Sequence, residues 1–231
     1  MISVTNAPPK TPAKPVFSLS QQRLKQSGRV VLSIDRLEIL PGEKVALLGH
    51  SGVGKSTLLD VLYAQCPKDV AWCPQQLGLI EPLSVYHNVY AGRLSRYPLW
   101  YNLANLLRPW PGRQHEVTEL LTPLRLTEKL TSKIHQLSGG QRQRTALARA
   151  LYQQRPTFLG DEPTTGVDPV QSLTLLAHVL NAHTTAVVAL HDAELALACC
   201  TRIIGLKAGS ILFDKPSQQV SSTDLERLYQ C

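Results

Sequence analysis

The segment from Lys44 to Leu59, KVALLGHSGVGKSTLL, constrains the fold more than any other part of the sequence. A short apolar strand, Val45 to Leu48, leads into it, and a run with helix propensity ends it. The pattern G-x-x-x-x-G-K-S between a strand and a helix predicts a phosphate-binding loop. The residues of the predicted loop are Gly49, His50, Ser51, Gly52, Val53, Gly54, Lys55, Ser56 and Thr57.

The residue types of this loop have a physical reason. Glycines let the backbone wrap closely around an anion, so that consecutive N–H groups point inward at the positive end of the following helix. Lys55 adds a full charge for the terminal phosphates, and the Ser56 hydroxyl is placed to ligate Mg²⁺. We therefore expect an α/β protein that binds a nucleotide. The alternative is a glycine-rich turn that binds nothing.

Length and composition indicate one compact domain in the cytoplasm. The chain has 231 residues, of which 43% are hydrophobic and 18% charged, as in ordinary globular proteins. It has no apolar run long enough to span a membrane, and its N-terminus lacks the apolar core of a signal peptide. Five cysteines without a C-x-x-C pair agree with a reducing compartment. The proline-rich residues 1–15 are expected to form a flexible arm, and residues 16–231 the domain.

The chain is basic, with a formal net charge of +7. Such a charge is typical of proteins that bind nucleic acid or an anionic membrane surface, and it also occurs on ordinary nucleotide-binding proteins. The basic residues are spread along the chain in ones and twos, without a block of like charge. We therefore expect no nucleic acid partner.

Further polar residues follow predicted strands. Residues 70–73 indicate a short strand that ends before Gln75, and a buried strand from Thr157 ends at Asp161 and Glu162. In open α/β sheets, ligands bind at the carboxyl edge where such residues lie. A glutamine there can ligate the metal or orient a water, although on this segment alone an ordinary surface glutamine is the better interpretation. Asp161 is predicted to hold Mg²⁺ and Glu162 to polarise an attacking water, rather than serving as a helix cap and a solvated charge.

A third strand, Thr184 to Leu190, ends at His191, which is predicted to contact a γ-phosphate at the same edge. A second anion-binding helix start is predicted at residues 137–141, LSGGQ, where a glycine-bearing turn opens an amphipathic helix. Before the first strand of the core, residues 16–39 alternate as an antiparallel pair of strands. Near the end, a hairpin through Ala208 and Gly209 precedes a helix from Thr223 to Tyr229, capped by Ser222 or Thr223.

Residues 83–133 are mostly helix-forming and contain an aromatic run. The run consists of Tyr97, Trp100, Tyr101 and Trp110. Two interpretations are equally open at this point: a docking surface for another chain, or packing between short helices.

Taken together, these motifs resemble the nucleotide-binding subunit of an ATP-binding cassette (ABC) transporter. The resemblance covers nearly the whole chain, from Val16 to Tyr229, with the motifs in the family's order. GHSGVGKST resembles the Walker A loop, LSGGQ the signature and TFLGDEPT the Walker B strand with its catalytic glutamate. Gln75 resembles the Q-loop glutamine, Asp168 lies in a segment like the D-loop, and His191 resembles the switch histidine.

The resemblance implies the fold and the partners. It implies a P-loop NTPase with an ABC-type ATPase core, a reduced antiparallel β subdomain, and an α-helical subdomain inserted at about residues 83–150. It also implies a head-to-tail homodimer that hydrolyses ATP with Mg²⁺, bound to a permease on the inner face of the cell membrane and served by a solute-binding protein. The catalytic residues would be Gln75, Glu162 and His191. Metal ligands would be Ser56, Gln75 and Asp161, and the partner's ATP would be held by Ser138, Gly139, Gly140 and Gln141.

The sequence departs from the family pattern in three places, and each departure leads to an expectation. Gln75 follows Lys55 by only 20 positions, so the antiparallel subdomain should be reduced. The region that usually carries an adenine-stacking aromatic residue, Leu24 to Gln26, has none, which weakens the grip on adenine unless Phe17 substitutes. Gly160 replaces an aliphatic residue before Asp161 and is expected to loosen packing beneath the metal ligand.

Within the family, residues 83–103, LSVYHNVYAGRLSRYPLWYNL, resemble the phosphonate-type importer ATPases. Two rival functions stay open. One is a soluble ABC protein of DNA repair or translation, against which the single cassette and the absence of heptads argue. The other is a catalytically weak scaffold, motivated by the short segment before Gln75 and the missing aromatic residue.

Overall fold

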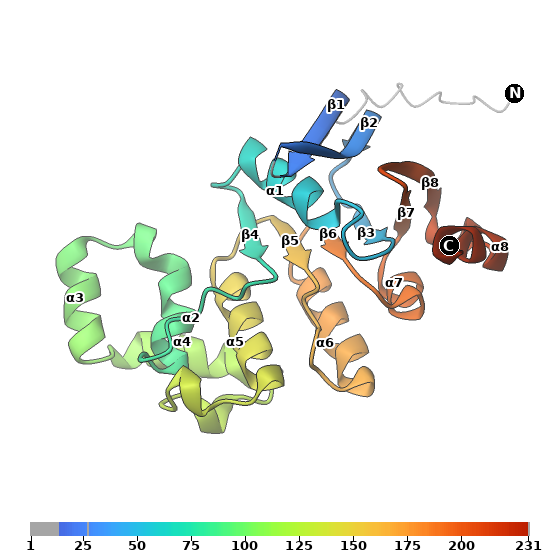
Figure 1. Cartoon of the computed structure of the whole chain (residues 1–231). Coiled ribbons are helices and arrows are strands. Elements are labelled where there is room, and N and C mark those ends of the chain that lie inside the picture. Colours follow the sequence, from blue (N-terminus) through green and yellow to red (C-terminus); the bar gives the residue numbers. More distant parts are fainter. Residues whose placement is uncertain (1–13, 27, 231) are drawn as a thin grey trace, which may run out of the picture.

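The computed structural model describes residues 14–26 and 28–230. The expected arm, residues 1–15, therefore lies almost entirely outside the described residues. At the centre is a six-stranded sheet in the order β4-β5-β6-β3-β7-β8, parallel except for the antiparallel edge strand β8 (Figure 1). The strands are β3 (Lys44–Leu48), β4 (Val70–Cys73), β5 (Thr157–Asp161), β6 (Thr185–Ala189), β7 (Arg202–Lys207) and β8 (Ser210–Pro216).

Helices cover both faces of this sheet because its strands are apolar on both sides. Every residue of β5 and β6 is buried, as expected for parallel strands covered on two faces. Along β3, Val45 and Leu47 join one core, and Ala46 and Leu48 join the other. The first core lies against α1 (Lys55–Gln65), and the second against α5 (Gly139–Tyr152), α6 (Pro169–Asn181) and α7 (Ala193–Cys199).

A small antiparallel sheet of two strands, β1 (Phe17–Gln26) and β2 (Arg29–Ile39), packs on the α1 side. Its alternating buried and exposed positions follow the predicted pattern of residues 16–39. The expected reduction of the antiparallel part is confirmed, because the chain passes from α1 directly to β4.

The segment between β4 and β5 is helical, with α2 (Val85–Tyr90), a 3₁₀ turn over Ala91–Arg96, α3 (Leu99–Leu107) and α4 (Pro111–Leu121). The packing interpretation of the aromatic run is confirmed for three of its residues, and the docking interpretation stays a prediction. Tyr97 and Tyr101 stack with ring centroids 5.0 Å apart, and Tyr101 stacks on Trp110 at 5.6 Å. Trp100 instead points outward and is 69% exposed. No helix within the described ranges has the length and apolar character needed to cross a membrane.

Packing beneath Asp161 is tight, so the expected loosening at Gly160 is wrong. A Cβ added at Gly160 would lie 2.8 Å from Cε1 of Phe158 and 3.2 Å from Cγ of Pro163. The Phe158 ring, which is buried, folds back over the glycine and fills the space that an aliphatic side chain would take.

The C-terminal part follows the prediction except at one cap. β7 and β8 form the hairpin expected at Ala208 and Gly209, both of which have positive φ angles of 48° and 74°. The last helix is α8 (Ser222–Tyr229), and its cap is Ser221, whose hydroxyl accepts a bond from the Asp224 N–H at 3.1 Å. The prediction of Ser222 or Thr223 as the cap was wrong because the helix begins one residue earlier than expected.

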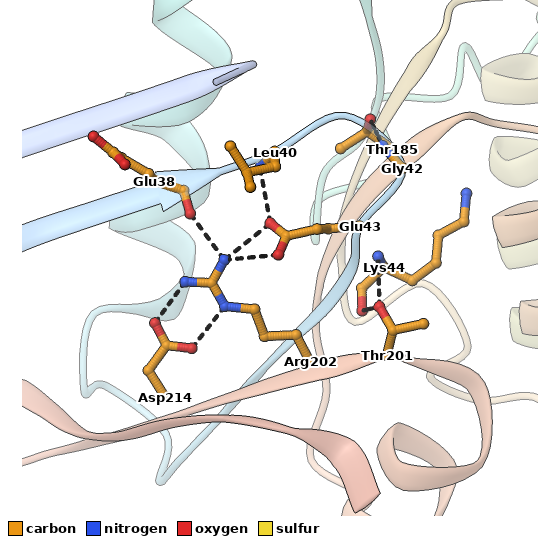
Figure 2. Close-up of polar contacts among 9 residues, drawn as sticks. All are labelled: Glu38, Leu40, Gly42, Glu43, Lys44, Thr185, Thr201, Arg202 and Asp214. Carbon is orange, nitrogen blue, oxygen red and sulfur yellow. Dashed lines mark hydrogen bonds and ion pairs between the residues drawn. The ribbon is translucent and has the colours of Figure 1, made fainter. Parts of the chain in front are cut away.

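Arg202 at the start of β7 ties three parts of the fold together (Figure 2). Its Nε and Nη2 donate to the two carboxylate oxygens of Asp214 on β8, at 2.7 and 2.6 Å. Its Nη1 donates to Glu43 before β3 at 2.9 Å, and to the Glu38 carbonyl of β2 at 2.9 Å. One guanidinium thus joins the edge hairpin, the entry to β3 and the small sheet.

Replacing Arg202 with alanine leaves Glu43 and Asp214 without their shared partner in a partly buried place. We expect the free energy of unfolding to fall by about 2–3 kcal/mol, measured by urea denaturation. Arg36→Ala is the matched control, because Arg36 pairs with Glu38 in solvent and should cost less than about 1 kcal/mol. Equal losses in the two variants would contradict the role given to Arg202.

Candidate active site

The residues predicted from the strand ends meet at one edge of the central sheet. The loop of residues 49–54 follows β3, Gln75 follows β4, Glu162 follows β5 and His191 follows β6. These four strands are neighbours and run in the same direction, so their carboxyl ends lie together. This is the edge at which open α/β sheets bind ligands.

The glycine-rich loop is shaped by close backbone approach. Gly49 has φ 145°, and a Cβ there would lie 2.3 Å from the carbonyl oxygen of Leu206 on β7. Gly54 has φ 107°, and a Cβ there would lie 3.0 Å from Cβ of Leu32 on β2. Both positions therefore require glycine, and they press the loop against β7 and β2.

The side chain of Lys55, the first residue of α1, lies within the curve of the loop of residues 49–54. Its Nζ donates to the carbonyl oxygens of Gly49 at 2.6 Å and His50 at 3.2 Å, and its side chain is buried. Burial lowers the pKa of Lys55, while the nearby carboxylates of Glu162 and Asp161 act in the opposite direction. A cation surrounded by a backbone loop at a helix N-terminus is a binding site for an anion such as phosphate.

Asp161 places a buried carboxylate near Lys55. The side chain is buried, and its Oδ1 has no hydrogen-bond partner among the described residues. Burial raises the pKa of Asp161, while the adjacent Ser56 hydroxyl lowers it. An unpartnered carboxylate oxygen beside a hydroxyl is an oxygen donor set that fits Mg²⁺. Gln75 lies exposed at the end of β4.

Glu162 and His191 are in direct contact, Nε2 of the histidine with Oε1 of the carboxylate. The other carboxylate oxygen accepts a hydrogen bond from the Thr165 hydroxyl at 3.1 Å, and the Glu162 carbonyl accepts one from Gln143 Nε2 at 3.2 Å. Glu162 has a positive φ of 51°, which is rare for a residue with a side chain and is found at functional sites. The carboxylate is therefore fixed from two sides.

Sequence reasoning missed three residues at this site. Thr165 lies three positions after Glu162, a spacing that permits a contact within one turn, and Gln143 lies two positions after the LSGGQ motif. The third is Tyr229 on α8, whose ring lies edge-on to His50 with centroids 5.5 Å apart. Its hydroxyl is 3.5 Å from the His191 carbonyl, at the outer limit of a hydrogen bond. No sequence signal pointed to a contact between segments so far apart.

The LSGGQ segment begins α5 as predicted. The Ser138 hydroxyl accepts a bond from the Gln141 N–H at 3.3 Å, and the Gln141 side chain accepts one from the Ser138 N–H at 3.0 Å. This reciprocal pair caps the helix. A Cβ at Gly140 would lie 2.8 Å from the Gly166 carbonyl, so this motif packs on the segment before Asp168. Asp168 in turn caps α6 by accepting a bond from the Val170 N–H at 3.0 Å.

Phe17 does not replace the missing aromatic residue. It is 1% exposed and packs in the core beneath β1 and β2. The hairpin of β1 and β2 adjoins the glycine-rich loop through Leu32. Three exposed residues lie near the tip of this hairpin, Lys25, Gln26 and Val30. The alternative that Phe17 substitutes for the missing aromatic residue is therefore wrong, because the alternation of β1 turns the Phe17 ring inward.

Comparison with known proteins identifies the family of this chain. A family profile described as ABC transporter matches residues 32–165, which is more than half of the chain. The phosphonates import ATP-binding protein PhnC of Pseudomonas fluorescens (strain Pf0-1) is 40% identical over 224 residues, covering 84% of this chain and 83% of that protein. PhnC of Burkholderia pseudomallei (strain K96243) is 34% identical over 236 residues, covering 88% and 76%.

Solved structures agree in fold. The dimeric structure of MJ0796, a bacterial ABC transporter cassette, has a TM-score of 0.70 and 26% identity, covering 87% of this chain and 97% of that chain. A dimeric post-hydrolysis state of the cassette MJ0796 bound to ADP and Pi has a TM-score of 0.68 and 25% identity, covering 88% and 99%. From its motifs, its site and these similarities, this chain belongs to the ABC transporter family and is one of its ATP-binding cassettes, an ATPase.

Proposed function

We propose that this cassette hydrolyses ATP to power the import of phosphonates through a separate permease. The observation that carries the catalytic part is the contact of Glu162 with His191 beside Lys55 and Asp161. The names of the PhnC relatives support the solute class and the direction of transport. A solute-binding protein that delivers the phosphonate, and a location on the inner face of the cell membrane, belong to the same proposal.

The roles proposed for the side chains follow from their positions. Lys55 leaves the carbonyls of its own loop and binds the β- and γ-phosphates, together with the N–H groups of residues 49–57. Ser56, Asp161 and Gln75 would hold Mg²⁺, which supplies charge neutralisation at the phosphate oxygens when it is bound. Glu162 accepts a proton from the attacking water, and His191 orients Glu162 and contacts the γ-phosphate.

A second copy of the chain completes each site in this proposal. Two dimeric cassette structures are similar to this chain, which supports a head-to-tail homodimer. The signature residues Ser138, Gly139, Gly140 and Gln141 would contact the ATP held by the partner's phosphate loop. The N–H groups at the start of α5 suit a phosphate for the same reason as those of α1. Asp168 lies beside the signature and would face the partner.

Glu162→Gln tests the proposed base. The variant keeps the size of the side chain but cannot accept the proton, so kcat for ATP should fall by a factor of at least about 100. ATP binding should persist, and light scattering should detect an ATP-held dimer. Glu194→Gln, at an exposed position of α7, is the matched control and should keep the parent kcat. Parent turnover in Glu162→Gln would exclude this residue as the base.

Gln26→Tyr tests the weak grip on adenine. An aromatic ring near the hairpin tip gains stacking of about 1 kcal/mol, so KM for ATP should fall about fivefold. Inorganic triphosphate has no base, and its binding should not change. Gln26→Ala controls for loss of the glutamine and should leave KM within about twofold. Equal gains for ATP and triphosphate would show that the tyrosine acts by another route than stacking.

A further inference from the structure

Tyr229, the last residue of α8, lies between two loops of the candidate active site. Its ring is edge-on to the His50 ring, with centroids 5.5 Å apart and an angle of 83° between the ring planes. Its hydroxyl faces the His191 carbonyl at 3.5 Å. His50 belongs to the glycine-rich loop after β3 and His191 to the loop after β6, so one side chain borders both loops.

The glycine-rich loop of residues 49–54 has few side chains that can hold its shape. Three of its six residues are glycines with positive φ, 145° at Gly49, 81° at Gly52 and 107° at Gly54. The two outer glycines press against β7 and β2, whereas Gly52 between them is exposed. A glycine backbone is conformationally permissive, so a loop of this composition depends on contacts to select one conformation. The ring of His50 provides such a contact near the tip of the loop.

The backbone of His50 connects this contact to the lysine of the loop. The His50 carbonyl accepts hydrogen bonds from Lys55 Nζ at 3.2 Å and from the Val53 N–H at 3.4 Å. The second bond closes a turn over residues 50–53. A shift of His50 would therefore open this turn and move a carbonyl oxygen that faces the charged end of Lys55.

Helix α8 is attached to the hairpin of β7 and β8 near both of its ends, so its side chains have fixed positions. Near the start, Lys215 of β8 pairs with Asp224 at 2.8 Å. Near the end, Lys207 of β7 donates to the Gln230 carbonyl at 2.8 Å, and Leu228 is fully buried in the core. The helix lies beside this hairpin, at the edge of the sheet away from β4 (Figure 1).

The ring of Tyr229, more than its hydroxyl, carries the contact. Burial raises the pKa of Tyr229, and the negative charge of Asp192 raises it further, so the phenol stays protonated at neutral pH. It can therefore donate toward the His191 carbonyl, but 3.5 Å is the outer limit of a hydrogen bond. The edge-on arrangement of the two rings is, in contrast, one that aromatic pairs prefer.

We propose that Tyr229 is a positioning residue for the glycine-rich loop and acts through the ring of His50. An aromatic pair stabilises the arrangement that brings its rings together beyond the area that it buries. The contact therefore raises the fraction of molecules whose loop has the shape that receives phosphate, and the apparent affinity for the ligand rises with that fraction. The inference rests on the proposed binding of ATP phosphates by residues 49–57.

A double-mutant cycle on the full chain tests this role, with dissociation constants for Mg-ATP measured by calorimetric titration. Tyr229→Leu and His50→Ala should each raise the dissociation constant about fivefold, because each removes the aromatic pair. His50 is exposed, so its replacement leaves the core intact. The variant with both changes should also lose about fivefold rather than about twenty-five-fold, because the pair can be lost only once. Inorganic triphosphate should show the same losses, since the contact acts on the loop and not on the base.

Two further variants separate the ring contact from other effects. Tyr229→Phe keeps the ring and should stay within about twofold of the parent. Tyr63→Leu is the matched control, because Tyr63 is a partly buried tyrosine near the far end of α1 that stacks on Trp72 with centroids 5.6 Å apart. It should bind Mg-ATP as the parent does.

The outcomes distinguish this inference from the proposed function. Parent affinity in Tyr229→Leu, or losses that multiply fully in the double variant, would overturn the positioning role alone. A parent chain that binds neither ATP nor triphosphate would overturn the proposed function and this inference together.

Discussion

The candidate active site depends on one row of paired residues across the parallel sheet, in which Asp161, Ala189 and Leu47 lie side by side on β5, β6 and β3. The pairing continues past the strand ends, since the Glu162 N–H donates to the Ala189 carbonyl at 3.1 Å and the Leu190 N–H to the Leu47 carbonyl at 3.1 Å. Three loops thus leave the sheet at the same level. A shift of one residue in either pairing would turn the alternate side chains to the opposite face and separate the polar groups.

The sequence was sufficient for features encoded by neighbouring residues and insufficient for those made by distant ones. The place of the glycine-rich loop between β3 and α1 and the edge at which Glu162 lies could be predicted, because a motif and the direction of parallel strands determine them. The burial of Phe17 and the Phe158 ring over Gly160 could not, because each depends on which face a side chain takes in a packed core. The contact of Tyr229 with His50 joins residues far apart in the chain, and no local pattern encodes it.

In the helical segment between β4 and β5, aromatic residues close together in the sequence take different environments, some packed inside and some exposed. Tyr86, Tyr90 and Tyr97 stack in succession, with centroids 6.0 and 6.1 Å apart, and form the interior of this segment together with polar groups from α3. The polar interior leaves the apolar residues of α3 for the outside. Hydropathy alone assigns apolar and aromatic side chains to the core. The sequence therefore could not show that Trp100 is exposed while its neighbour Tyr101 packs inside.

The place of β3 in the sheet has a consequence for folding during synthesis. Its two neighbours are β6 and β7, where Val45 lies opposite Val187 and Arg202. While the ribosome makes the intervening residues, β3 can pack with α1 and the small sheet but has no strand beside it. Contacts of such long sequence separation form late and slowly. Because Gly49 packs against the Leu206 carbonyl of β7, we expect the glycine-rich loop to gain its final shape only after β7 has been made, and a ligand bound there to stabilise the last stage of folding.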